Sequence, residues 1–186
     1  DNIRLVRKTS AAAPAGPVTP SVTAITAVTP LQASVAQYGM IEFAVEMDAA
    51  YNNPYDPTEI RLDGRFTSPS GEVVLVPGFY FEDHAYLRGI PVSTGETSWR
   101  VRFTPVESGD YSYRIIATTL SGSARSSAGN FTVTASDNPG FVRVDSRNPR
   151  YMAFDNGAPY YPIGLNIGWS TGDTIADYTT WLDGLS

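Results

Sequence analysis

The sequence predicts a mainly β protein: an antiparallel β-sandwich followed by short strands and one C-terminal helix. From about Ser21 to Ala135, apolar and polar residues alternate with the period of two that places successive side chains on opposite faces of a strand. Turn-rich segments such as "SPSGE" and "SGSARSSAG" separate about seven such runs. Short alternating strands with no helical pattern between them are typical of a sandwich of the immunoglobulin type.

The same alternation predicts the core and the solvent-facing charges. The inward positions are Ile41, Phe43, Val45, Met47, Ile60, Leu62, Phe66, Trp99, Val101, Phe103, Tyr111, Tyr113, Ile115, Ala117, Phe131 and Val133. All the glutamates are expected to be solvated: Glu42, Glu46, Glu59, Glu72, Glu82, Glu96 and Glu107. Because "ESGDYSYRI" places tyrosines directly after a turn, either Tyr111 or Tyr113 is expected to bond its hydroxyl to nearby backbone as a corner tyrosine.

Composition limits the classes of function. Lys and Arg total 13 against 19 Asp and Glu, a net charge of −6, which argues against binding to nucleic acid or to an anionic membrane face. The chain has no cysteine, which excludes disulfides, thiolate metal sites and cysteine nucleophiles. It has a single histidine, His84, which is expected to be an ordinary loop residue. Neither a membrane-spanning apolar run nor a signal-peptide core is present, so an export signal is expected to be removed or to lie upstream. No cofactor or metal is expected.

The sequence divides into four segments. Residues 1–8 read as one short strand that closes a preceding module, and residues 9–20, "TSAAAPAGPVTP", have the composition of a semi-extended linker. Residues 21–136 form the predicted sandwich. Residues 137–186 begin with short strands around a tight turn at "DNGA" (155–158).

The end of this last segment predicts a strand followed by a helix. The apolar run at 160–169 lacks polar alternation, as in a strand covered on both faces. After candidate N-caps that include Asp173, apolar residues follow at helical spacing: Ile175, Tyr178, Leu182 and Leu185. A strand and a helix are half of a βαβ unit, which needs further strands to form a parallel sheet.

Several segments in this order are similar to one known family. They are "YNNPYDP" (51–57), "GFYFED" (78–83), "SWRVRFTPVESGDYSYRI" (98–115), "SDNPGFVRV" (136–144), "NPRYMAFDNGAPYYPIGLNIGW" (148–169) and "DYTTWLDGL" (177–185). Over roughly residues 35–186 the chain resembles the immunoglobulin-like N-terminal domain, of unknown function, that precedes the (β/α)8 barrel of bacterial glycoside hydrolases. The resemblance implies that "PIGLNIGW" is the first barrel strand and "DYTTWLDGL" the first barrel helix. "DNIRLV" is also similar to the last strand of jelly-roll carbohydrate-binding modules.

The resemblance implies an accessory domain of a secreted, multidomain glycoside hydrolase acting on plant-type polysaccharide. Its partners would be the intramolecular catalytic barrel and, through the parent enzyme, the polysaccharide. The paired catalytic carboxylates of such enzymes lie on later barrel strands, so this chain by itself is expected to be inactive. Because barrels place their sites at the C-terminal ends of strands, Asn166 and Trp169 are candidate sugar contacts; otherwise Trp169 would pack at the barrel rim and Asn166 would cap the turn.

Two alternatives remain open at this stage. The sandwich itself could bind glycan through exposed aromatic residues, with Tyr80 and Tyr86 in "PGFYFEDHAYLRG" (77–89) as candidates; otherwise this segment packs against the barrel. An adhesive cell-surface domain is also compatible with the fold, which does not decide function. In addition, "YNNPYDPTE" (51–59) is either a rigid carboxylate-capped turn or a calcium loop.

Overall fold

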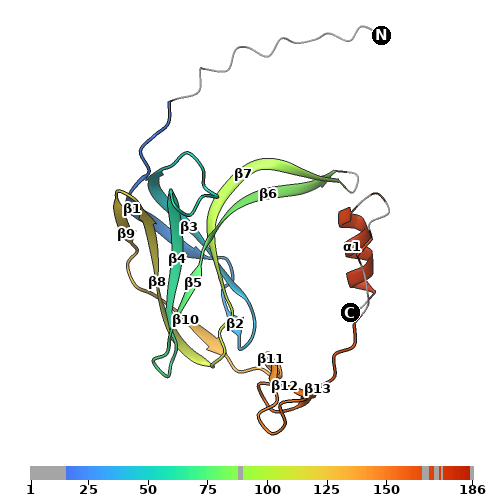
Figure 1. Ribbon diagram of the computed structural model, residues 1–186. Coiled ribbons are helices and arrows are strands. Elements are labelled where there is room, and N and C mark those ends of the chain that lie inside the picture. Colours follow the sequence, from blue (N-terminus) through green and yellow to red (C-terminus); the bar gives the residue numbers. More distant parts are fainter. Residues whose placement is uncertain (1–15, 88–89, 165–167, 170–171, 173, 185–186) are drawn as a thin grey trace, which may run out of the picture.

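The prediction of a mainly β fold with a single C-terminal helix is confirmed. The computed structural model describes residues 16–87, 90–164, 168–169, 172 and 174–184. Its strands form two large sheets and one small sheet, followed by α1 (Thr174–Asp183) (Figure 1). Within these residues, no helix has the length and apolarity that a bilayer crossing requires.

The two large sheets are antiparallel except at one edge. The first sheet has the strand order β1 (Ser21–Pro30), β3 (Ile41–Ala50), β7 (Ile90–Phe103), β6 (Phe79–Leu87). The second has the order β2 (Val35–Ala36), β10 (Gly129–Thr134), β8 (Gly109–Thr119), β4 (Ile60–Thr67), β5 (Val73–Pro77), with β9 (Gly122–Arg125) beside β8. The short strand β2 pairs in parallel with β10.

The core lies between these two sheets, as the alternating pattern predicts. Phe43 of the first sheet lies 5.6 Å from Phe66 and 4.7 Å from Tyr113 of the second, measured between ring centroids. Phe66 also stacks on Phe103 at 4.1 Å. The inward positions named above are buried, apart from Met47 and Phe131, which pack partly buried against the same core. Burial of this many large apolar side chains is the main stabilising contribution to such a sandwich.

Glu42 lies on the outer face as predicted, but the expectation that its side chain is solvated is wrong. Its side chain is buried, and its carboxylate accepts hydrogen bonds from Arg100 and Arg102 of the neighbouring strand β7. Period-two alternation identifies the outer face correctly, but the long arginine side chains lie over that face and cover the carboxylate.

The small third sheet contains β11 (Val142–Val144), β12 (Met152–Phe154) and β13 (Pro159–Tyr160). It confirms the strands predicted at "FVRV" and "RYMAF" and the tight turn after them, in which Gly157 has a φ of 84° and donates to the carbonyl of Phe154; of the described residues of the third strand, predicted over 160–166, only Tyr160 is paired. The sheet meets the sandwich at Tyr38, whose ring packs edge-on against Phe141 at 5.6 Å.

The chain beyond β13 differs from the sequence prediction. Residues 161–164 and 168–169, expected to belong to a buried strand, are exposed and carry no strand pairing; residues 165–167 lie outside the described residues. A strand needs a neighbour to accept and donate its ladder hydrogen bonds, and these residues have none beside them in Figure 1. The predicted helix is present as α1; Asp173 and Leu185 lie outside the described residues.

Candidate functional site: an aromatic groove at the start of β6

The loop from 51 to 59, between β3 and β4, is held by its own polar side chains. The Glu59 carboxylate accepts hydrogen bonds from the backbone N–H groups of Asn52 (2.6 Å) and Asn53 (3.0 Å). The Asp56 carboxylate accepts from both the backbone N–H (2.9 Å) and the hydroxyl (2.7 Å) of Thr58, which lower the pKa of Asp56. These bonds give the loop a single defined shape.

This arrangement has the carboxylate caps that one of the two sequence interpretations predicts. The carboxylates of Asp56 and Glu59 are directed at backbone N–H groups of the loop itself. Across the part of the chain that the structure describes, no three His, Cys, Asp or Glu side chains gather in a group that could share a metal ion. Because these polar side chains fix the loop backbone, they also fix the positions of the aromatic residues that the loop carries.

Four aromatic side chains meet beside this loop. Tyr51 and Tyr55 come from the loop, Tyr80 from β6 and Trp99 from β7. Tyr80 packs edge-on against Tyr55 (5.6 Å), Trp99 (5.4 Å) and Tyr51 (6.5 Å), and the Trp99 indole N–H donates to the Tyr51 hydroxyl at 3.2 Å. Edge-on contacts of this kind fix ring orientation as well as ring position.

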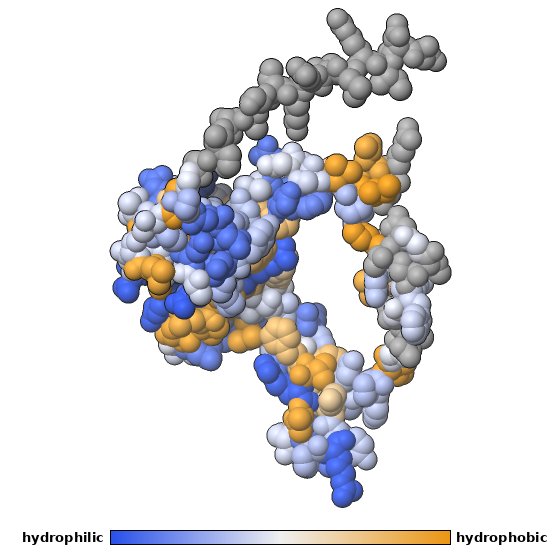
Figure 2. Space-filling view, turned by 45° about the horizontal axis from the view of Figure 1, so that its top comes forward, coloured by the Kyte–Doolittle hydropathy of each residue, from blue (hydrophilic) through white to orange (hydrophobic). Residues whose placement is uncertain are grey.

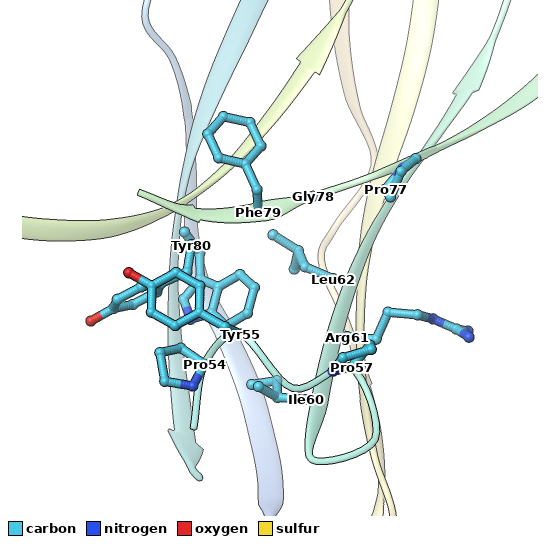
Figure 3. A pocket seen from close by; sticks show the side chains of 11 residues that line it. Pro54, Tyr55, Pro57, Ile60, Arg61, Leu62, Pro77, Gly78, Phe79 and Tyr80 are labelled. Atoms are coloured by element: carbon cyan, nitrogen blue, oxygen red, sulfur yellow. The ribbon is translucent and has the colours of Figure 1, made fainter. Parts of the chain in front are cut away.

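A groove of about 340 Å³ opens next to this cluster (Figure 3). Its lining is mostly apolar: Pro54, Tyr55, Pro57, Ile60, Leu62, Pro77, Gly78, Phe79, Tyr80 and Trp99, with Arg61 as the charged member. Ile60 and Leu62 are buried, whereas the side chain of Tyr55 is 64% exposed. The groove thus has a closed apolar floor and an exposed aromatic wall.

Gly78 sets the depth of the groove. A Cβ atom at this position would lie 2.7 Å from Cδ2 of Leu62 and 2.9 Å from the carbonyl oxygen of Arg100. Its backbone N–H donates to the carbonyl of Leu62 at 2.7 Å. Only a residue without a side chain lets β6 begin this close to β4, so Gly78 determines where Phe79 and Tyr80 stand relative to the loop.

The positive charge that lines the groove is balanced by a carboxylate on the same strand. The guanidinium of Arg61 donates from Nε to the carboxylate of Asp63 at 2.8 Å. Both groups are partly solvated, so this pair contributes little to stability. The pair does neutralise the one cation that lines the groove.

The sequence-predicted site residues do not come together. Tyr80 lines the groove, but Tyr86 lies at the far end of the β6–β7 hairpin, where it pairs with Pro91. Trp169 is 85% exposed and is itself in neither a strand nor a helix, and Asn166 lies outside the described residues. Sequence reasoning missed Tyr55, although the two tyrosines four residues apart in "YNNPYDP" offered a signal.

The β6–β7 hairpin extends past the sandwich. Strand β7 pairs with β3 only from Trp99 to Phe103, whereas its pairing with β6 continues to Ile90. At the far end, large apolar side chains are exposed on both strands: Tyr86, Leu87, Ile90 and Val92. At the start of β6, the side chain of Tyr80 faces the core. Phe79 and Phe81 lie on the opposite, outer face, under the guanidinium groups of Arg102 and Arg100.

The fold and groove define a β-rich domain with an apolar, aromatic-lined surface site. Residues 34–118 match the family model described as a domain of unknown function, DUF5060. The chain is similar to the crystal structure of "a putative glycoside hydrolase from Bacteroides vulgatus", with a TM-score of 0.51 and 25% sequence identity. The match covers 72% of this chain and 22% of that protein, so this chain spans about a fifth of its length. No curated protein matches the sequence.

Proposed function

We propose that this chain is the accessory, non-catalytic part of an exported, multidomain glycoside hydrolase that acts on plant-type polysaccharide. The observation that carries the proposal is the structural match, which takes in most of this chain but only 22% of a protein named as a glycoside hydrolase. In this reading the large sheets are an immunoglobulin-like domain, to which the parallel β2–β10 pairing lends support. Its role is to brace the catalytic domain.

The distribution of apolar surface supports a bracing role. The end of the β6–β7 hairpin and the helix α1 both carry exposed apolar side chains, including Leu87, Ile90 and Leu182. Figures 1 and 2 place these two regions on the same side of the sandwich, around an open space. Two-stranded ribbons are marginally stable in water by themselves, so a partner that covers this end would stabilise it.

The C-terminal residues support the same proposal. The described residues after β13 present Ile163, Trp169 and Leu182 to solvent. If they form the first strand and helix of a catalytic barrel, the other strands of that barrel would supply the missing ladder partners. Asn166 and Trp169 would then stand at the rim of the catalytic cleft.

A pair of matched variants tests the bracing role. Leu87 at the hairpin end and Leu75 on β5 are equally exposed, at 65% and 64%. In the isolated chain, Leu87→Asp and Leu75→Asp should leave the thermal midpoint unchanged, since both side chains are solvated. In the full-length enzyme, Leu87→Asp should lower the midpoint by about 2 °C or more, because it places a charge in an apolar interface, while Leu75→Asp should not.

Differential scanning calorimetry of the two full-length variants gives the answer. Equal midpoints for both variants in the full-length protein would contradict the bracing role. A reading frame around this chain that encodes no hydrolase domain would remove the proposal altogether, and a frame of repeated β-sandwiches would favour the adhesive alternative instead.

A further inference from the structure

We propose that the groove between the 51–59 loop and the start of β6 is a binding subsite for a neutral glycan, in which a sugar ring stacks on Tyr55. The choice of glycan as the ligand rests on the proposed function, whereas the site itself rests on the geometry of the groove. The relevant side chains are Tyr55 and Pro54 of the loop, with Ile60 and Leu62 of β4 beside them, whereas the Phe79 ring points to the other side of β6 (Figure 3).

Tyr55 is exposed yet held in place. Its backbone N–H donates a hydrogen bond to the side-chain oxygen of Asn53 at 3.0 Å. Its ring packs edge-on against the ring of Tyr80, with 5.6 Å between the centroids and 87° between the ring planes. An exposed aromatic ring in a mobile loop would have to be ordered by its ligand, at a cost in binding free energy. Here the loop hydrogen bonds and the Tyr80 contact orient the ring beforehand, as a preorganised stacking platform requires.

The shape of the groove suits a pyranose ring. A sugar ring has an apolar C–H face and a polar edge of hydroxyl groups, so it binds best where an apolar surface meets water. Ile60 and Leu62 are buried and apolar, whereas Arg61 and the Tyr55 ring, which also line the groove, are exposed. The volume of about 340 Å³ falls at the lower end of ligand-site volumes, enough for a short stretch of a glycan chain.

The charges around the groove select for a neutral chain. Arg61 is neutralised by Asp63, and the neighbouring loop carries the carboxylates of Asp56 and Glu59. The whole chain has a net charge of −6. An anionic glycan such as a polyuronate would meet unfavourable charge here, whereas cellulose-, xylan- or mannan-type chains would not.

Affinity electrophoresis of the 186-residue chain tests the site with four probes: hydroxyethyl cellulose, arabinoxylan, galactomannan and polygalacturonate. Tyr55 and Tyr86 are matched, since each is 64% exposed, but only Tyr55 lines the groove. We expect retardation in at least one neutral gel, about tenfold weaker binding for Tyr55→Ala, and unchanged binding for Tyr86→Ala. Tyr55→Phe keeps the ring and should retain most of the binding.

Three outcomes of the electrophoresis would overturn the proposal. Binding that is lost in Tyr86→Ala and kept in Tyr55→Ala would place the site on the hairpin. Retardation in polygalacturonate alone would contradict the charge argument, and no retardation in any gel would exclude a glycan site on the sandwich, leaving a peptide or protein as its occupant. Circular dichroism spectra of the variants identify any loss of folding. A parent gene without a hydrolase domain would remove the proposed function but would leave a positive binding result intact.

Discussion

Glu42 illustrates how a charged residue on a strand is stabilised away from water. Only 4% of the residue is exposed, and the Arg100 Nη1 donates to its carboxylate at 2.6 Å while Arg102 donates to the other carboxylate oxygen. Each arginine also lies over an aromatic ring of β6, with the Arg100 guanidinium 3.7 Å from the centroid of Phe81. The carboxylate, guanidinium groups and rings therefore form one layer on the outside of the first sheet.

The ion pairs of Glu42 predict a pH-dependent stability. Burial by itself raises the pKa of Glu42, but the hydrogen bonds and charges of Arg102 and Arg100 outweigh it and hold the pKa below its usual range. Since the folded pKa lies below the unfolded value of about 4.3, the stabilisation is complete above that pH and is lost as the pH falls through the folded pKa.

Glu42→Gln should therefore lower the free energy of unfolding by about 1–2 kcal/mol at pH 7, because both arginines remain partly solvated. Urea unfolding of both proteins from pH 7 to pH 3 measures the difference, which should shrink below about pH 4. A difference that stays constant over this range would show that the ion pairs do not carry the effect.

Tyr111 is the corner tyrosine that the sequence predicted as one of two candidates. Its hydroxyl accepts a hydrogen bond from the backbone N–H of Glu107 at 3.0 Å, and burial raises the pKa of its phenol. Tyr113 instead packs its ring against Phe43 in the core. Alternation placed both tyrosines inward, and only the turn geometry decided between them.

Tyr111→Phe should destabilise the chain by about 1 kcal/mol, since it leaves a backbone N–H without its partner. Urea unfolding gives the free energy, and Tyr151→Phe, at an exposed residue just before β12, serves as the control. Identical unfolding midpoints for the two variants would contradict a corner role for Tyr111.

Among the elements, the β6–β7 hairpin combines two environments in one ribbon. Near the sandwich, β6 and β7 belong to a sheet, with Tyr80 and Trp99 turned toward the core. Farther out, Leu87 pairs with Ile90 and both are exposed. The alternating pattern changes along β7: residues 93–98, "STGETS", carry no large apolar side chain, and alternation begins at Trp99, where pairing with β3 also begins. Strand β3 itself continues past that point to Ala50, where it pairs with β1.

The segment after β13 behaves as a separate element. Its helix lies apart from the two large sheets in Figure 1, and its residues Ile163 and Trp169 are exposed. Exposed backbone without ladder hydrogen bonds opens readily to proteases.

Limited proteolysis of the isolated chain should therefore remove residues from about 161 onward before the sandwich is cut. Mass spectrometry of the fragments over time identifies the first cleavage sites, with the paired strands β4 and β8 as the internal reference. A monomer, verified by sedimentation, in which this segment resists as long as β4 and β8 would contradict the prediction.

At the scale of the whole molecule, the sandwich and the small sheet are joined through Tyr38. This residue has a φ of 63°, a left-handed conformation that is unfavourable for a large side chain. Its backbone N–H donates to the carbonyl of Pro105, and its ring covers Phe141. Asp155 completes the junction by accepting hydrogen bonds from the backbone N–H of Phe141 and from Arg143. The backbone strain at Tyr38 is thus offset by contacts to both units.

The sequence by itself determined the fold class, the inward faces of the strands and the presence of α1. These features depend on the local spacing of apolar residues along the chain. Phe43 and Phe66, for example, are both inward positions of alternating strands, and they meet in the core. Only the tertiary structure decided that Glu42 is buried, that Tyr111 forms the corner, and that Tyr55 joins Tyr80 beside one groove. Those outcomes depend on which residues from distant strands become neighbours, and alternation along a single strand carries no information about its neighbours.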